Sequence, residues 1–172
     1  MENNEEKKDV KKILLPLKFS QAGSRAFAMA LNMAKCCDAW LDIISVLKPA
    51  PGMNLAQKED FKKEIGAEFD RFKESHGPWF QDFKNYRFAW LIGDPATEIL
   101  KYAESASADL IVLGVHYRND RPCYNRLGEV AQRVFQSAPC AVMLVPSGLK
   151  REKTVSGDRE HLRQRIWEGN AS

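Results

Sequence analysis

The sequence lacks a long apolar stretch and a strong excess of charge of either sign. No stretch approaches the ~18–20 apolar residues that a membrane helix requires, and residues 1–12, MENNEEKKDVKK, contain no apolar segment of the kind found in a secretory signal. The formal net charge of +3 is too small to indicate binding to nucleic acid. We therefore expect a cytoplasmic protein with no membrane insertion and no nucleic-acid partner.

Metal-ligating and nucleophilic residues are few and poorly spaced. The cysteines and histidines of the chain are Cys36, Cys37, Cys123, Cys140, His76, His116 and His161. They fit no zinc-site spacing, so we expect no metal. In a reducing cytosol the thiols are expected to be inert, and no histidine spacing suggests a base for a nucleophilic cysteine. The absence of a catalytic set predicts a protein that is not an enzyme.

Short apolar runs and helical patterns alternate along most of the chain. Apolar runs typical of buried strands lie at 13–17, 40–47, 86–92, 109–114 and 140–146. Amphipathic helical patterns lie at 21–36, 54–75, 95–107 and 126–137. This alternation predicts an α/β fold with a doubly wound, five-stranded parallel sheet of the Rossmann-like type and helices on both faces.

The ends of the chain differ from this central pattern. Residues 1–11 are expected to form a charged, mobile leader, residues 12–147 the α/β domain, and residues 148–172 a charged extension. The extension could form one short amphipathic helix over 158–168, or it could be disordered or loosely docked. Trp167 on that segment could contact the chain's own dimer mate or another protein, so the extension is a candidate surface for a protein partner.

Four segments, in their order and spacing, resemble the universal stress protein family. They are ILLPLKFS at 13–20, GDPATEIL at 93–100, ADLIVLG at 108–114, and GEVAQRV at 128–134 leading into APCAV at 138–142. The resemblance implies a five-stranded doubly wound fold and a homodimer paired through its last strand, here Ala141, Val142, Met143, Leu144 and Val145. An unpaired apolar edge strand is a liability that dimerisation removes, which favours the same arrangement. The charged extension covering that edge is the alternative.

The resemblance also implies where a nucleotide could bind. Some members of the family bind ATP through a G-x-x-G motif, nine further residues and then Gly-Ser or Gly-Thr, commonly with an acidic residue after the first strand. Such glycines and amides let the backbone approach phosphates closely. The corresponding positions here, together with their neighbours, are Pro16, Leu17, Lys18, Val46, Gly114, His116, Tyr117, Gly128, Glu129 and Val130.

Three of these positions depart from the ATP-binding pattern. Tyr117 replaces the second glycine, Glu129 replaces the hydroxyl residue one position late, and Lys18 stands where the acid is expected. Glu129 would place a carboxylate beside phosphate oxygens, although a carboxylate in the first turn of a helix also stabilises that helix without any ligand. The sequence therefore predicts that the typical ATP site is lost.

Other interpretations of the altered loop remain open. Arg118, Arg121 and Arg126 could form a different anion site with Lys18, or they could be solvated arginines of a polar loop. His116 could be a base or a nucleotide contact, or a solvated histidine. We expect a non-enzymatic stress-response homodimer without a cofactor; the alternative is a member that binds ATP or AMP through an atypical loop. A flavodoxin-like receiver is disfavoured because the first strand ends in Lys18 and not in an acidic cluster.

Overall fold

The computed structural model describes residues 9–18, 21–115 and 127–146 of the chain. Several positions that the sequence analysis singled out lie outside these residues. They are His116, Tyr117, Arg118, Arg121, Cys123 and Arg126, most of the leader, and the whole extension 148–172.

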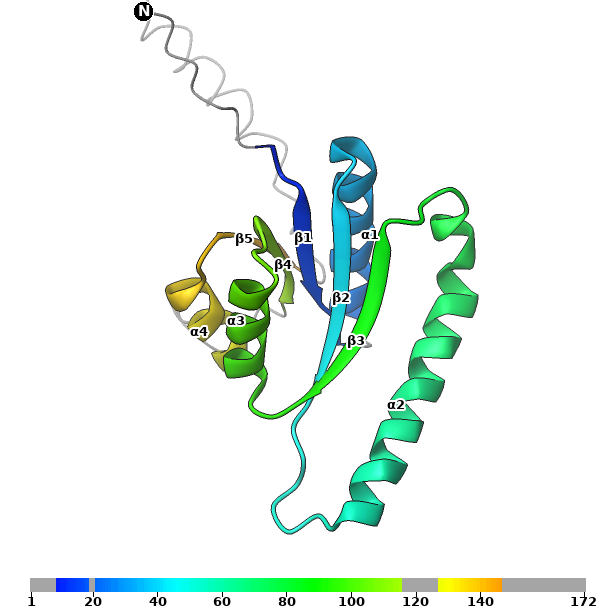
Figure 1. Ribbon diagram of the computed structural model, residues 1–172, viewed down its shortest axis with the longest axis vertical. Coiled ribbons are helices and arrows are strands. Elements are labelled where there is room, and N and C mark those ends of the chain that lie inside the picture. Colours follow the sequence, from blue (N-terminus) through cyan, green and yellow to red (C-terminus); the bar gives the residue numbers. More distant parts are fainter. Residues whose placement is uncertain (1–8, 19–20, 116–126, 147–172) are drawn as a thin grey trace, which may run out of the picture.

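The chain alternates strands and helices in the predicted order (Figure 1). The elements are β1 (Lys12–Pro16), α1 (Gln21–Cys37), β2 (Trp40–Leu47), α2 (Leu55–His76), the 3-10 helix η1 (Gly77–Phe80), β3 (Tyr86–Ile92), α3 (Pro95–Ser105), β4 (Leu110–Val115), α4 (Glu129–Ser137) and β5 (Ala141–Pro146). The strands form one sheet in the order β3-β2-β1-β4-β5, and every neighbouring pair is parallel. The predicted doubly wound fold is confirmed.

The bounds of the helices differ slightly from the prediction. Helix α3 ends at Ser105, because Ser107 has a left-handed backbone with φ of 51° that a helix cannot accommodate. Helix α4 begins at Glu129, with Gly128 as its N-cap residue. The η1 turn was not predicted. It follows α2 where Pro78 prevents the helix from continuing.

The central strand β1 is buried on both faces. Ile13, Leu14 and Leu15 have no exposed surface. Strand β1 pairs with β2 on one side over five residues and with β4 on the other, so both of its edges are hydrogen-bonded within the sheet. A strand covered above, below and at both edges requires apolar side chains in succession, which explains why this segment lacks an alternating pattern.

One face of the sheet packs against α1 and the end of α2. Phe27 of α1 is fully buried there, and its ring centroid lies 4.9 Å from that of Phe72 and 5.1 Å from that of Phe80. The opposite face packs against α3 and α4 through Leu14 and Ile111, among others. Figure 1 shows α3 and α4 together on the near side of the sheet and α1 behind it, which places helices on both faces.

An ion pair between a buried carboxylate and an exposed arginine ties β2 to the edge strand β3. Asp42 is 1% exposed, and its two carboxylate oxygens accept hydrogen bonds from the Arg87 guanidinium at 2.7 and 3.0 Å. The indole N–H of Trp40 donates to the same carboxylate at 3.0 Å. Hydrogen bonding to Asp42 raises the pKa of Arg87 above its usual range. The buried carboxylate is therefore fully paired, as burial of a charge requires.

The packing of Phe27 yields a test of the fold. We expect Phe27→Ala to lower the free energy of unfolding by about 3–5 kcal/mol, because it opens a cavity in the α1 side of the core. Met29→Ala on the same helix is the control, since Met29 is 44% exposed and its loss should cost about 0.5 kcal/mol or less. Urea denaturation of both variants measures the difference, and equal losses would contradict the assigned packing.

Candidate functional site

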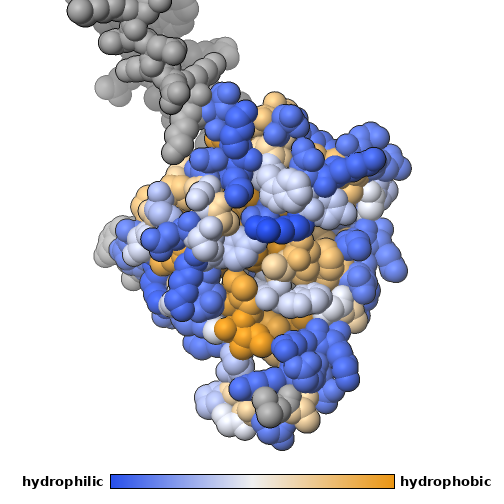
Figure 2. Space-filling model, viewed as in Figure 1, coloured by the Kyte–Doolittle hydropathy of each residue, from blue (hydrophilic) through white to orange (hydrophobic). Residues whose placement is uncertain are grey.

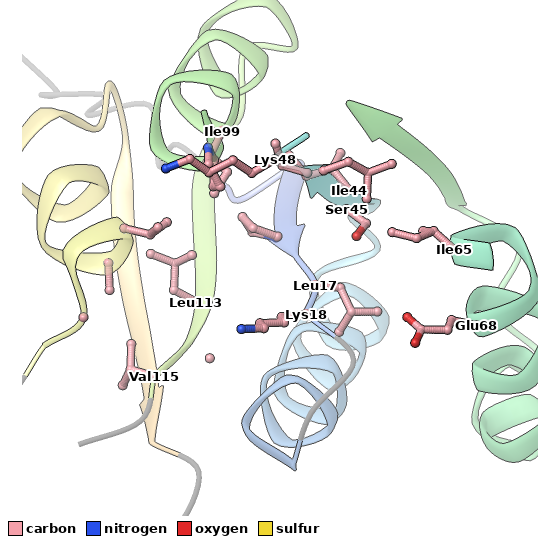
Figure 3. A pocket seen from close by; sticks show the side chains of 18 of the residues that line it. Leu17, Lys18, Ile44, Ser45, Lys48, Ile65, Glu68, Ile99, Leu113 and Val115 are labelled. Carbon is pink, nitrogen blue, oxygen red and sulfur yellow. The ribbon is translucent and has the colours of Figure 1, made fainter. Parts of the chain in front are cut away.

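A pocket of about 730 Å³ opens where the parallel strands end (Figure 3). Its floor comes from the carboxyl ends of β1, β2 and β4, and its walls from α2 on one side and from α3 and α4 on the other. Open parallel sheets generally bind ligands at this end. The volume is also within the ~300–1,000 Å³ typical of small-molecule sites.

Seven of the ten nucleotide-site positions named from the sequence line this pocket. They are Pro16, Leu17, Lys18, Val46, Gly114, Gly128 and Val130. Glu129 is exposed at the start of α4 and is not among the lining residues. His116 and Tyr117 lie outside the described residues, as do the three arginines of the proposed anion site. The structure thus brings four separate sequence segments together at one place.

The turn after β1 is held by two backbone contacts. The Leu17 N–H donates to the Ile44 carbonyl at 2.8 Å, which extends the pairing of the β1 chain with β2 beyond the strand. Gly23 is buried near the start of α1, where a Cβ atom would collide with the Lys18 carbonyl oxygen. Only glycine fits there without a shift, so Gly23 helps to fix the position of Lys18 at the pocket. Sequence reasoning did not find this role.

The wall formed by α2 was also missed from the sequence. Phe61, Ile65 and Glu68 of this helix line the pocket. The spacing of the apolar residues in α2 predicted one packing stripe. In the structure, only the later part of that stripe is buried in the core, through Phe69 and Phe72. Two earlier members of the stripe, Phe61 and Ile65, face the pocket instead. Their helical spacing was the only available signal.

The charges around the pocket are unevenly placed. Among the lining residues that the structure describes, the charged ones are Lys18, Lys48 and Glu68. In Figure 3, Lys18 and Lys48 extend toward the side on which Ile99 and Leu113 lie, whereas Glu68 projects from α2 on the opposite side. The pocket therefore has a cationic side and an anionic side, separated by apolar residues.

The first turn of α4 meets the pocket without a side-chain cap. Gly128 has extended backbone angles and no capping hydrogen bond, while Val130 and Ala131 line the pocket. Glu129 is an acidic residue in that first turn. A carboxylate here complements the partial positive charge of the helix N-terminus. The same carboxylate occupies the helix end at which a phosphate group would otherwise be favoured.

A network around Asp94 fixes the N-terminus of α3 against α4. Asp94 caps α3, and its Oδ1 accepts from Thr97 Oγ1 at 2.7 Å, from Thr97 N–H at 3.1 Å and from Arg133 of α4 at 2.8 Å. The Thr97 hydrogen bonds, with Arg133, lower the pKa of Asp94 to about 2. Pro95 and Ile99 of α3 line the pocket, so this network positions one of its walls.

Hydrophobic residues also reach the surface near the pocket end of the sheet. Figure 2 shows them in the lower centre of the view, close to the carboxyl ends of β2 and β3, bordered by hydrophilic residues. Ile92, the last residue of β3, is 44% exposed.

No helix among the described residues is long and apolar enough to cross a membrane, and those residues contain no group of three or more potential metal-ligating His, Cys, Asp or Glu side chains.

Comparison with known proteins identifies the family of this chain. Residues 9–146, which include every strand and helix described above, match the sequence model of the universal stress protein family. The chain belongs to the universal stress protein family. It is 32% identical over 142 residues to the universal stress protein MJ0531 of Methanocaldococcus jannaschii, covering 78% of this chain and 81% of that protein.

Solved structures of the family share the fold. The universal stress protein UspA from Lactobacillus plantarum superposes with a TM-score of 0.60 at 25% identity, covering 79% of this chain and 97% of that one. A universal stress protein in complex with cAMP superposes with a TM-score of 0.60 at 18% identity, covering 81% of this chain and 99% of that one. The universal stress protein from Archaeoglobus fulgidus in complex with dAMP superposes with a TM-score of 0.55 at 16% identity, covering 80% of this chain and 98% of that one. At these last two identities the likeness concerns the fold alone.

The Asp94 network predicts a pH dependence of stability. Because the pKa of Asp94 is lowered on folding, its contribution is present above the ordinary value of 3.8 and is lost as the pH falls through about 2. Asp94→Asn, which can still cap the helix, should lose less stability than the wild type between pH 4 and pH 2. Urea denaturation at several pH values measures this. Asp82→Asn, at an exposed turn, serves as the control and should follow the wild type; parallel curves for all three proteins would contradict the assignment.

Proposed function

We propose that the chain is a non-enzymatic, cytoplasmic stress-response protein that acts as a homodimer and has lost the typical ATP site of its family. The observation that carries the proposal is the charge placement at the strand ends. Lys18 follows β1 where ATP-binding relatives are expected to have an acid, and Glu129 begins α4 where phosphates would be held. At 4 Å, two like charges repel by about 4 kcal/mol at an effective dielectric constant of 20.

The side chains near the pocket favour binding over catalysis. Its described lining contains one hydroxyl, that of Ser45, and neither a thiol nor an imidazole that could act as nucleophile and base. Cys140 does not line the pocket, and burial together with the charge of Asp109 raises the pKa of its thiol. A raised pKa favours the protonated, unreactive form of a cysteine.

The exposed edge at β5 supports the homodimer. Strand β5 is at the end of the described sheet and pairs only with β4 there. Its sequence, AVMLVP, is apolar, and most of its side chains are partly exposed. An edge of this kind exposes unpaired backbone groups and invites pairing with another strand. A second copy of the chain would provide that strand. The extension 148–172 remains a candidate contact for a further protein partner.

The alternative is an adenine-nucleotide-binding member with an atypical loop. The retained pocket favours it, because seven positions named for a nucleotide site line that pocket. Family members of known structure have been solved with cAMP and with dAMP. A monophosphate carries less charge than ATP, so Glu129 would oppose it less strongly. Measurements with ATP and AMP separate the two functions.

Thermal denaturation tests the loss of the ATP site. We expect ATP–Mg at millimolar concentration to raise the melting temperature of the full chain by less than about 1 °C, because a ligand whose Kd is far above its concentration stabilises a protein very little. AMP is measured in parallel. A saturable rise above ~1 °C with ATP–Mg would overturn the proposal, and a rise with AMP alone would favour the alternative.

Light scattering tests the dimer. We expect the full chain to have twice the mass of 19.6 kDa calculated for one copy. Val142→Lys in β5 should shift the mass toward one copy, because two-fold pairing would bring two like charges close together. Ile92→Lys, on the opposite edge strand β3, is the matched control and should remain a dimer. Circular dichroism checks that both variants are folded. A monomeric wild type, or equal dissociation of both variants, would contradict pairing through β5.

A further inference from the structure

The pocket walls are mainly apolar, so they offer few side-chain partners to a polar ligand. Side chains of Ile44, Val46, Phe61, Ile65, Ile99 and Leu113 contribute to the lining, from β2, α2, α3 and β4. Ser45, which is 6% exposed, is the one polar uncharged residue in the described lining. A ligand with many polar groups would leave most of them without side-chain partners after leaving water, which is costly. The body of a matching ligand is therefore apolar.

The cationic side of the pocket provides a place for one anionic group. Lys48 lines the pocket and, within the described part of the chain, forms no ion pair or hydrogen bond through its side chain. Its side chain extends over the pocket toward Ile99 (Figure 3). Lys18 extends from the end of β1 toward the Leu113 side, apart from the Lys48 ammonium group (Figure 3). An ammonium group beside apolar surface attracts a carboxylate whose chain covers that surface.

The opposite side of the pocket disfavours a second anionic group. Glu68 lines the pocket from α2 and forms no ion pair with any described residue. Figure 3 shows its carboxylate turned toward the pocket beside Leu17. A ligand with charges at both ends would bring one of them close to this carboxylate, and like charges at short range repel. Glu68 thus selects against dianions that span the pocket.

We propose that the pocket binds a medium-chain monocarboxylate, with the carboxylate held by Lys48, the chain against the apolar walls, and Glu68 excluding diacids. The pocket volume of about 730 Å³ is in the range of small-molecule sites and accommodates such a chain. This goes beyond the proposed function, because a protein that has lost ATP binding need not bind another ligand.

Calorimetric titration of the full chain with dodecanoate below its micellar concentration tests the head group. We expect saturable binding that Lys48→Gln weakens about tenfold, whereas binding of dodecanol, which has the same chain and no charge, is unchanged by that variant. Lys84→Gln is the matched control, because Lys84 is exposed just before β3 at the other end of the strand. The absence of saturable dodecanoate binding, or an equal effect of both lysine variants, would overturn the proposal.

Titration with dodecanedioate tests the role of Glu68. The wild type should bind this diacid at least tenfold more weakly than dodecanoate, and Glu68→Gln should remove most of that difference. Glu74→Gln, an exposed position on the same helix that does not line the pocket, should leave it intact. Equal binding of both acids by the wild type would overturn the assigned selectivity. ATP–Mg binding measured separately decides the proposed function, so failure of either proposal is recognised independently of the other.

Discussion

The burial of β1 is the constraint on which the rest of the structure depends. Its apolar residues contact α1 on one face and the α3 and α4 layer on the other, and its backbone pairs with β2 and β4. Because both faces of the strand are packed and both of its edges are hydrogen-bonded, its carboxyl end has a fixed place relative to both helical layers. The residues that follow it, Leu17 and Lys18, consequently form part of the pocket floor. The core thus determines where the site is, while residues at its periphery determine the chemistry of the site.

The chemistry of the site depends on the helices that pack around this strand. Helix α2 contributes Glu68 and two apolar side chains from a stretch that precedes its buried residues. Helix α3 contributes Ile99 and is oriented through the contact between Asp94 and Arg133. Glu68, unlike Ile99, is not part of the buried core. Divergence of ligand preference can therefore occur in the walls without loss of the fold.

The fold could be predicted from the sequence because its signals are local and repeated. Each strand is an apolar run, as in 109–114, and each helix has an apolar spacing of three and four, so alternation alone indicated a parallel sheet. The positions at the strand ends followed from the same pattern, and Pro16, Gly114 and Gly128 do line one pocket. Glu68 could not be predicted in this way, since its place depends on how α2 lies against the sheet, whereas Lys48 directly follows β2 at the strand ends. No local pattern encodes that long-range packing.

The contact between Gly23 and the Lys18 carbonyl has a consequence for how such a pocket can evolve. The side chain at position 18 can change from acid to base in one substitution, because it points away from the packed turn (Figure 3). The backbone at that position has no such freedom, since α1 closes over it where only a hydrogen atom fits. Selection can therefore exchange the charge that a ligand meets while the turn presenting it stays the same.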